Sequence, residues 1–118
     1  MIKPTTTKIM SDLNYQSIFS ECVAAAEHEA RRDSNYSEDW GACGFAWVKI
    51  RPGTSKLARA AKKYAGASKS YNGGVDIWVS FGGQSVSVKK SYANAYARKL
   101  SELTGTGENQ IYGQSRLD

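Results

Sequence analysis

Gly41-Ala-Cys-Gly-Phe-Ala-Trp-Val-Lys-Ile50 is the stretch that decides the fold, because apolar side chains fall on both of its sides. In an extended chain Phe45 and Trp47 share one face, and the opposite face is formed by Ala46, Val48 and Ile50. Apolar residues on both faces are typical of a strand in the middle of a sheet. Pro52 and Gly53 then end the strand. We therefore expect a central strand over residues 41–50.

A basic amphipathic helix is expected directly after this strand. Thr54 or Ser55 is a suitable N-cap, and the helical pattern continues to about Ala65 before Gly66 ends it. The buried stripe of this helix comprises Leu57, Ala58, Ala61, Tyr64 and Ala65. The other side carries Lys56, Arg59, Lys62 and Lys63.

A β-hairpin follows the basic helix. Asn72-Gly73-Gly74 is a strong turn sequence, and it separates a short strand at residues 69–71 from a longer one at residues 75–81. Alternation along the longer strand places on one face Val75, Ile77, Val79 and Phe81. The opposite face carries Asp76, Trp78 and Ser80.

Two further helices and a last strand complete the expected domain. A first helix starts at Ser11 or Asp12 and ends near Arg32, and a third starts after Ser85 or Ser87 and ends near Leu103. A short strand is expected at about residues 110–116. We predict an α/β domain of the α+β type: a two-layer sandwich in which about three helices cover a small mixed or antiparallel sheet of three to four strands. Residues 1–10 are interpreted as a flexible lead-in and residues 11–118 as the single domain.

Charge is unevenly distributed along the chain. The net charge is +5 and the isoelectric point is about 9.3. Acidic residues dominate from Asp12 to Asp39, whereas the segment from Lys49 to Lys69 is cationic and the next acid is Asp76. Such a patch favours polyanions or an acidic protein face. The alternative is a solvated lysine-rich helix face without a partner, and the two interpretations stay open.

Catalytic and metal-binding patterns are absent from the sequence. The single histidine, His28, has no second histidine or cysteine cluster beside it, and no acid–base pair or phosphate-loop pattern is present. We interpret Cys22 and Cys43 as two buried thiols, without excluding a disulfide. No apolar run is long enough to span a membrane. The protein is therefore expected to be a non-enzymatic binding module that needs no cofactor or metal and has no membrane partner.

The candidate ligand-binding residues lie at strand ends and turns around the cationic segment. Lysine and arginine neutralise phosphates, serine donates a hydroxyl, and tyrosine and tryptophan stack on bases. Trp78 is assigned as a stacking platform, with burial beneath a helix as the alternative. The full set is Lys49, Arg51, Lys56, Arg59, Lys69, Ser70, Tyr71, Trp78 and Arg116.

Four blocks of the chain resemble small accessory proteins of tailed bacteriophages. These blocks are residues 43–52, 69–80 and 89–100 and the ending Ser115-Arg-Leu-Asp118, and the resemblance extends over residues 13–118. It implies a phage origin, action in the host bacterial cytoplasm and an accessory role, but it transfers no catalytic residues. Proteins of this kind often counteract host defence by binding a protein, a nucleic acid or a nucleotide signal.

Two functions are carried forward from the sequence. The first is binding of a phosphate-bearing ligand, either a nucleic acid or a nucleotide signal, through the cationic surface. The second is inhibition of a host protein that docks on the same surface. Self-association into a homo-oligomer is compatible with both.

Overall fold

The computed structural model describes residues 12–33, 36, 42–81, 83, 85–107 and 109–117. Three helices are present in this part of the chain, namely α2 (Asp12–Arg31), α3 (Lys56–Tyr64) and α4 (Val86–Thr104). Four strands accompany them, namely β1 (Gly44–Ile50), β2 (Ser68–Lys69), β3 (Val75–Trp78) and β4 (Ile111–Leu117).

The four strands form one antiparallel sheet in the order β2-β3-β1-β4. β1 is central, as its sequence predicted, and it pairs with β3 from Trp47↔Trp78 to Ile50↔Val75 and with β4 along its whole length. In the β1–α3–β2 unit, β3 lies between the two strands of the unit, and in the β3–α4–β4 unit β1 lies between them. This is the split βαβ connectivity of ferredoxin-like domains, preceded here by the extra helix α2.

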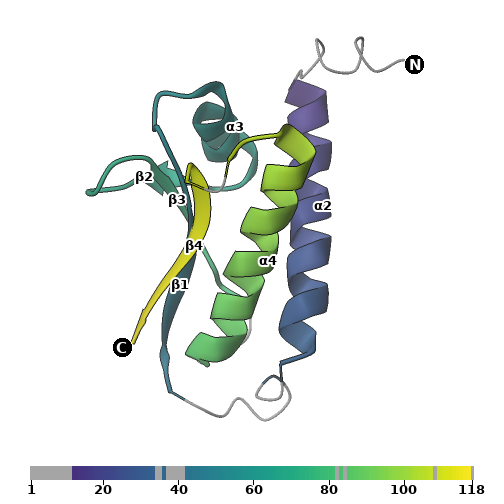
Figure 1. The fold of residues 1–118 in the computed structure, drawn as a ribbon, viewed down its shortest axis with the longest axis vertical. Coiled ribbons are helices and arrows are strands. Elements are labelled where there is room, and N and C mark those ends of the chain that lie inside the picture. Colours follow the sequence, from purple (N-terminus) through teal and green to yellow (C-terminus); the bar gives the residue numbers. More distant parts are fainter. Residues whose placement is uncertain are drawn as a thin grey trace.

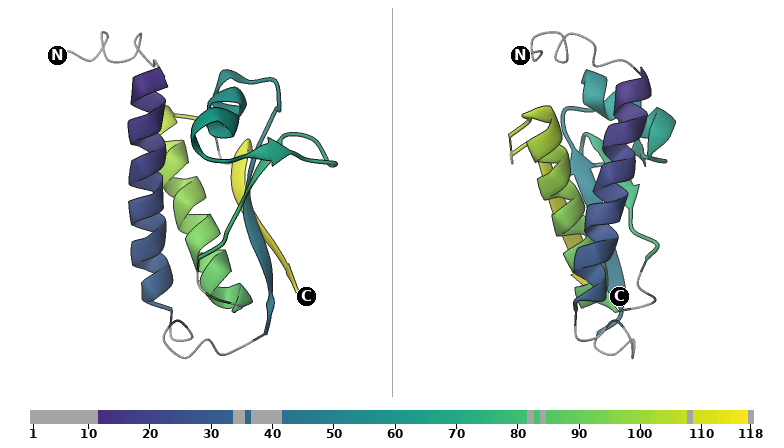
Figure 2. Two further views of the ribbon diagram at one scale, coloured as in Figure 1. Left: turned by 180° about the vertical axis from the view of Figure 1, so that it is seen from behind. Right: turned by 90° about the vertical axis from the view of Figure 1, so that its right-hand side faces the viewer.

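The helices all lie on one side of the sheet, so the domain has a helical layer and a sheet layer (Figure 1, Figure 2). α4 lies against β1 and β4, and α2 runs alongside α4. The core between the layers is formed from β1 by Ala46, Val48 and Ile50, and from the helices by residues that include Phe19, Cys22, Ala61, Tyr96 and Leu100. The expected two-layer α+β sandwich is therefore confirmed, and its sheet is antiparallel.

Local capping signals determine where two of the helices begin and end. The Ser55 side chain accepts a hydrogen bond from Ala58 N at 3.0 Å at the start of α3, and Ser85 does the same for Val88 N at 3.4 Å at the start of α4. Gly105 ends α4 in the left-handed conformation with φ of 73°, which glycine adopts without steric cost.

The hairpin strands are shorter than the sequence predicted. β2 contains only Ser68 and Lys69, and β3 ends at Trp78 rather than at Phe81. Phe81 leaves the sheet and stacks between Tyr36 and Tyr92, with ring centroids 5.7 and 5.4 Å away. The alternating pattern at residues 79–81 thus reflects aromatic packing outside the sheet.

Some expectations concern residues outside the described part of the chain, namely the lead-in at residues 1–10, a helix start at Ser11 and a strand start at Gly41. Within the described residues, no helix is long and apolar enough to cross a membrane.

Candidate functional site

The sheet has an open face that is covered by none of the helices α2, α3 and α4 (Figure 1). Alternation along the strands directs to this face Phe45 and Trp47 from β1, Asp76 and Trp78 from β3, and Tyr112, Gln114 and Arg116 from β4. Phe45 is 38% exposed and Trp78 is 49% exposed. Two large aromatic side chains are therefore accessible to a ligand on the two neighbouring strands at the centre of the sheet.

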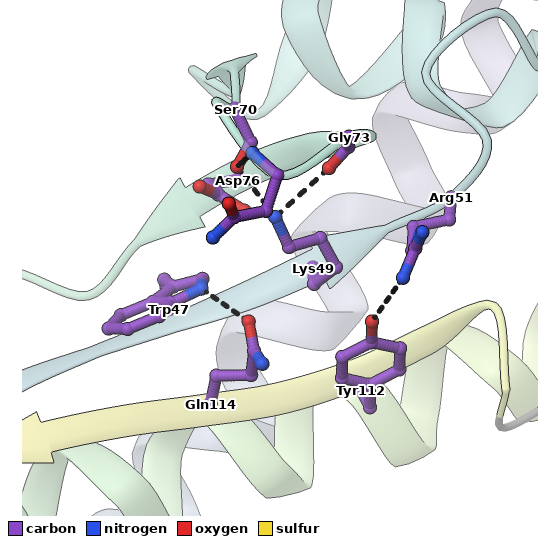
Figure 3. A network of polar contacts seen from close by, with 9 residues as sticks. Trp47, Lys49, Arg51, Ser70, Gly73, Asp76, Tyr112 and Gln114 are labelled. Atoms are coloured by element: carbon purple, nitrogen blue, oxygen red, sulfur yellow. Dashed lines mark hydrogen bonds and ion pairs between the residues drawn. The ribbon is translucent and has the colours of Figure 1, made fainter.

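The aromatic cluster of the open face consists of Phe45, Trp47 and Trp78. The Trp47 and Trp78 rings lie 4.7 Å apart at 38°, and Phe45 meets Trp78 edge-on at 6.5 Å. Trp47 Nε1 donates a hydrogen bond of 2.9 Å to Gln114 Oε1, which fixes the indole plane on the sheet (Figure 3). Because neighbouring rings and this hydrogen bond hold the cluster, little rotamer freedom remains to be lost on binding.

Two cations lie beside Phe45, at the end of the aromatic cluster nearest the start of β1. The Arg116 guanidinium carbon lies 5.4 Å from the centre of the Phe45 ring, and Lys89 Nζ lies 5.7 Å from the same ring. Lys89 Nζ also donates a hydrogen bond of 3.2 Å to Gly44 O, which anchors α4 to the start of β1. These contacts place positive charge beside an exposed aromatic ring.

Lys49 and Asp76 form a buried ion pair beneath the β2–β3 turn (Figure 3). Lys49 Nζ lies 2.9 Å from Asp76 Oδ1, and the two side chains are 4% and 10% exposed. The same ammonium group donates hydrogen bonds to Ser70 Oγ at 2.6 Å and Gly73 O at 3.0 Å. Asp76 Oδ1 has no hydrogen bond of favourable geometry, so its contact with Lys49 is mainly electrostatic. Asp76 is the only acid in the four strands that the structure describes, and its charge is paired with that of Lys49.

A second feature, which we call the cationic groove, lies at the upper end of β1. It has a volume of about 650 Å³ and receives Arg51 from the end of β1, Lys62 from α3 and Lys69 from β2. Its lining also includes Ser70, Gly73 and Gln110, and the lining residues that the structure describes include no acid. Arg51 Nη1 donates to Tyr112 Oη at 3.2 Å, which links the groove to the open face (Figure 3).

The predicted ligand-binding residues fall into distinct places. Arg51, Lys69 and Ser70 line the cationic groove, whereas Trp78 and Arg116 lie on the open face. Tyr71 is fully exposed at the hairpin turn. Trp78 does not lie beneath a helix, so the burial alternative for this side chain is wrong.

Three of the predicted residues, namely Lys49, Lys56 and Arg59, are not among the residues that line the cationic groove. Lys49 is buried and ion-paired, so it supports the turn but presents no charge at the surface. Lys56 and Arg59 are exposed on α3 and do not line the cationic groove. Arg59 Nη1 instead donates to Thr54 O at 3.4 Å.

Sequence reasoning missed several residues of this surface. Phe45 and Trp47 were recognised as sharing one strand face but were not assigned to a ligand, although their period-two spacing was the available signal. Lys62 was interpreted only as part of a helix face. Tyr112 and Gln114 carried no local signal, because their places depend on pairing with β1 across more than sixty residues.

The described residues were predicted to include one histidine and two buried thiols, and the structure shows where these side chains lie. No group of three metal-ligating side chains occurs among the described residues, and His28 is exposed on α2. Burial, together with the neighbouring Glu21 carboxylate, raises the pKa of the Cys22 thiol to about 12, so this thiol stays protonated near neutral pH. Cys43 directly precedes β1 and is exposed, which corrects the expectation that both thiols are buried, and no disulfide joins them.

Comparison of the chain with protein-family models, curated protein sequences and solved structures found no match.

Proposed function

We propose that this protein binds single-stranded nucleic acid through the open face of its sheet, without catalysing a reaction. The observation that carries the proposal is the exposed aromatic cluster on the two central strands, with cations at both ends and its one acid neutralised. Bases stack on Trp78 and Phe45, and phosphates contact Arg51, Lys69 and Arg116.

The aromatic cluster favours nucleobases because each base presents a flat π-face. Stacking of a base on an aromatic side chain contributes about 1–3 kcal/mol and tolerates any sequence. Four-stranded sheets that bind RNA use aromatic residues on the same open surface to stack two or three bases. The likeness to those sheets lies in the architecture of the surface, and it does not imply a common origin.

The charge pattern favours a ligand longer than one nucleotide. Arg51 follows the last residue of β1, and Trp47 lies four residues earlier, a separation of about 13 Å along a strand. A strand that stacks on the aromatic cluster therefore needs several nucleotides to reach the cationic groove. If about four cations neutralise phosphates, log Kd changes with log salt concentration with a slope of about 3 for a single strand.

The proposal is tested by fluorescence anisotropy with a labelled single-stranded DNA of mixed sequence, at a series of salt concentrations. We expect Trp78→Ala to weaken binding by about 5- to 150-fold, the equivalent of one lost stack. The matched control is the double variant Lys56→Ala/Arg59→Ala, which removes two charges from α3 outside the groove and leaves most of the affinity. Absence of binding at low salt, or unchanged affinity in Trp78→Ala, would contradict the proposal.

The biological setting belongs to the same proposal. The resemblance to accessory proteins of tailed phages supports a role in the host bacterial cytoplasm, where binding of a nucleic acid would counteract a host defence. The test is infection of a defence-carrying strain by phage with and without this gene, complemented by the wild type or by Trp78→Ala. Equal rescue by the wild-type gene and the Trp78→Ala gene would show that the open face has no role in counteracting the defence.

The second candidate is an inhibitor that binds a host protein through the same surface. It is favoured by the exposed tryptophan and the neighbouring arginine, since both residue types dominate the binding energy of protein interfaces. A complex recovered from nuclease-treated lysate, lost in Trp78→Ala and only weakly dependent on salt, would support this candidate over nucleic acid.

A further inference from the structure

The cationic groove carries more positive charge than the binding of bases on the open face requires. Arg51, Lys62 and Lys69 come from three different elements and line one concavity of about 650 Å³, and none of the described residues that line it is an acid. Lys62 and Lys69 form no ion pair with any acid in the described part of the chain. Three cationic residues therefore line one concavity, and none of them forms an ion pair with an acid of the described part of the chain.

Ser70 also lines the groove, and its hydroxyl is held in place from the side of the open face. Ser70 Oγ accepts a hydrogen bond from Lys49 Nζ at 2.6 Å and another from Asn72 N at 3.3 Å. Because the oxygen is the acceptor in both contacts, its own proton is left to donate to a ligand. The buried ion pair between Lys49 and Asp76 fixes the ammonium group that holds this oxygen.

We propose that the cationic groove binds the terminal phosphate of the nucleic-acid strand, an inference that rests on the proposed function. A phosphodiester inside a strand carries one negative charge, whereas a terminal phosphate monoester carries about −1.5 to −2 at pH 7 and presents three oxygens. Three cations and one hydroxyl donor match this more highly charged group. An internal phosphodiester needs fewer of them.

The position of the groove agrees with the end of a strand. It lies past the last residue of β1, about 13 Å along that strand from Trp47. The end of the nucleic acid occupies the groove, and the following bases extend over the sheet towards the aromatic cluster. The protein then recognises strand ends and discriminates them from continuous strands.

The experiment compares three single-stranded DNA octamers of the same sequence, each with an internal fluorophore. One carries a 5′-phosphate, one a 3′-phosphate, and one has hydroxyls at both ends. We expect one of the two phosphorylated octamers to bind at least about tenfold more tightly than the octamer with hydroxyl ends, which is the effect of one charge-assisted hydrogen bond. The end that gives this gain assigns the polarity of the bound strand.

The decisive variant is Lys62→Ala/Lys69→Ala, with Lys56→Ala/Arg59→Ala as a control of equal charge. The groove variant should abolish the preference for a phosphorylated end, and the control should retain it. Equal affinities of all three octamers for the wild type would overturn the terminal-phosphate inference while the proposed function stands. A preference that survives in the groove variant would also overturn the inference, whereas failure of all three octamers to bind would refute the proposed function itself.

Discussion

Replacing Lys49 by methionine tests the buried ion pair on which the β2–β3 turn rests. Methionine has a similar length but carries no charge, so Lys49→Met removes the ammonium group and leaves the Asp76 carboxylate buried without its cation. The hydrogen bonds from Lys49 Nζ to Ser70 Oγ and Gly73 O are lost as well. We therefore expect a large loss of stability and a loosened turn around Tyr71.

The magnitude follows from the burial of the two side chains. An exposed ion pair contributes only about 0–1 kcal/mol. Lys49 and Asp76 are 4% and 10% exposed and lie 2.9 Å apart, and removing one partner of a buried pair costs about 3–5 kcal/mol. With a typical urea dependence of about 2 kcal/mol per molar, the unfolding midpoint should fall by about 2 M.

The assay is urea unfolding followed by tryptophan fluorescence. Lys56→Met is the control, because it removes an exposed lysine and should change the free energy of unfolding by no more than about 0.5 kcal/mol. The double variant Lys49→Met/Asp76→Leu removes both charges and should recover most of the loss, since an apolar pair of similar volume often replaces a buried ion pair without cost. Equal stability of Lys49→Met and the wild type would refute the reasoning, and so would a double variant less stable than Lys49→Met.

Three further predictions concern packing and thiol chemistry. Gly113→Ala should cost about 1–3 kcal/mol in urea unfolding, because its Cβ would lie 2.5 Å from Asn94 Oδ1 and 3.2 Å from Ala93 C, and Asn94→Ala should relieve part of this cost. Cys43 should react with a thiol reagent at pH 8 in the native protein, and Cys22 only in denaturant. Burial raises the pKa of the Cys22 thiol from 9.0 to about 12. The protonated thiol therefore contributes fully to the free energy of unfolding below pH 9, and this contribution is lost as the pH rises towards 12. Unfolding at pH 10.5 should reveal a loss of roughly 2 kcal/mol that Cys22→Ala abolishes.

Local signals predicted most of the secondary structure. The sequence placed the cap of α3 at Thr54 or Ser55 and that of α4 at Ser85 or Ser87, since a cap is a contact between residues three positions apart, and the structure has Ser55 and Ser85. The strand around Trp47 was predicted as central because both of its faces are apolar, and the sheet order confirms it. The lengths of β2 and β3 were not predictable, because a strand ends where its partner strand stops pairing.

The candidate site was predicted only in part. Trp78 was placed on the correct face by alternation, and Arg51 and Lys69 were placed correctly at strand ends. The pairing of Lys49 with Asp76 was not foreseen, since it depends on the register of β1 against β3. A lysine in a basic run was therefore interpreted as surface charge although it is buried.

The sequence by itself determined the order of helices and strands, two candidate caps for each of the later helices, the turn at residues 72–74 and the alternation that separates the two faces of the sheet. These properties depend on dihedral preferences and on contacts between near neighbours. The tertiary structure alone decided that α2, α3 and α4 lie on the same side of the sheet and that Arg51, Lys62 and Lys69 line one groove. Strand order and register bring together residues far apart in the chain, and both follow from the burial of a shared core rather than from any local pattern.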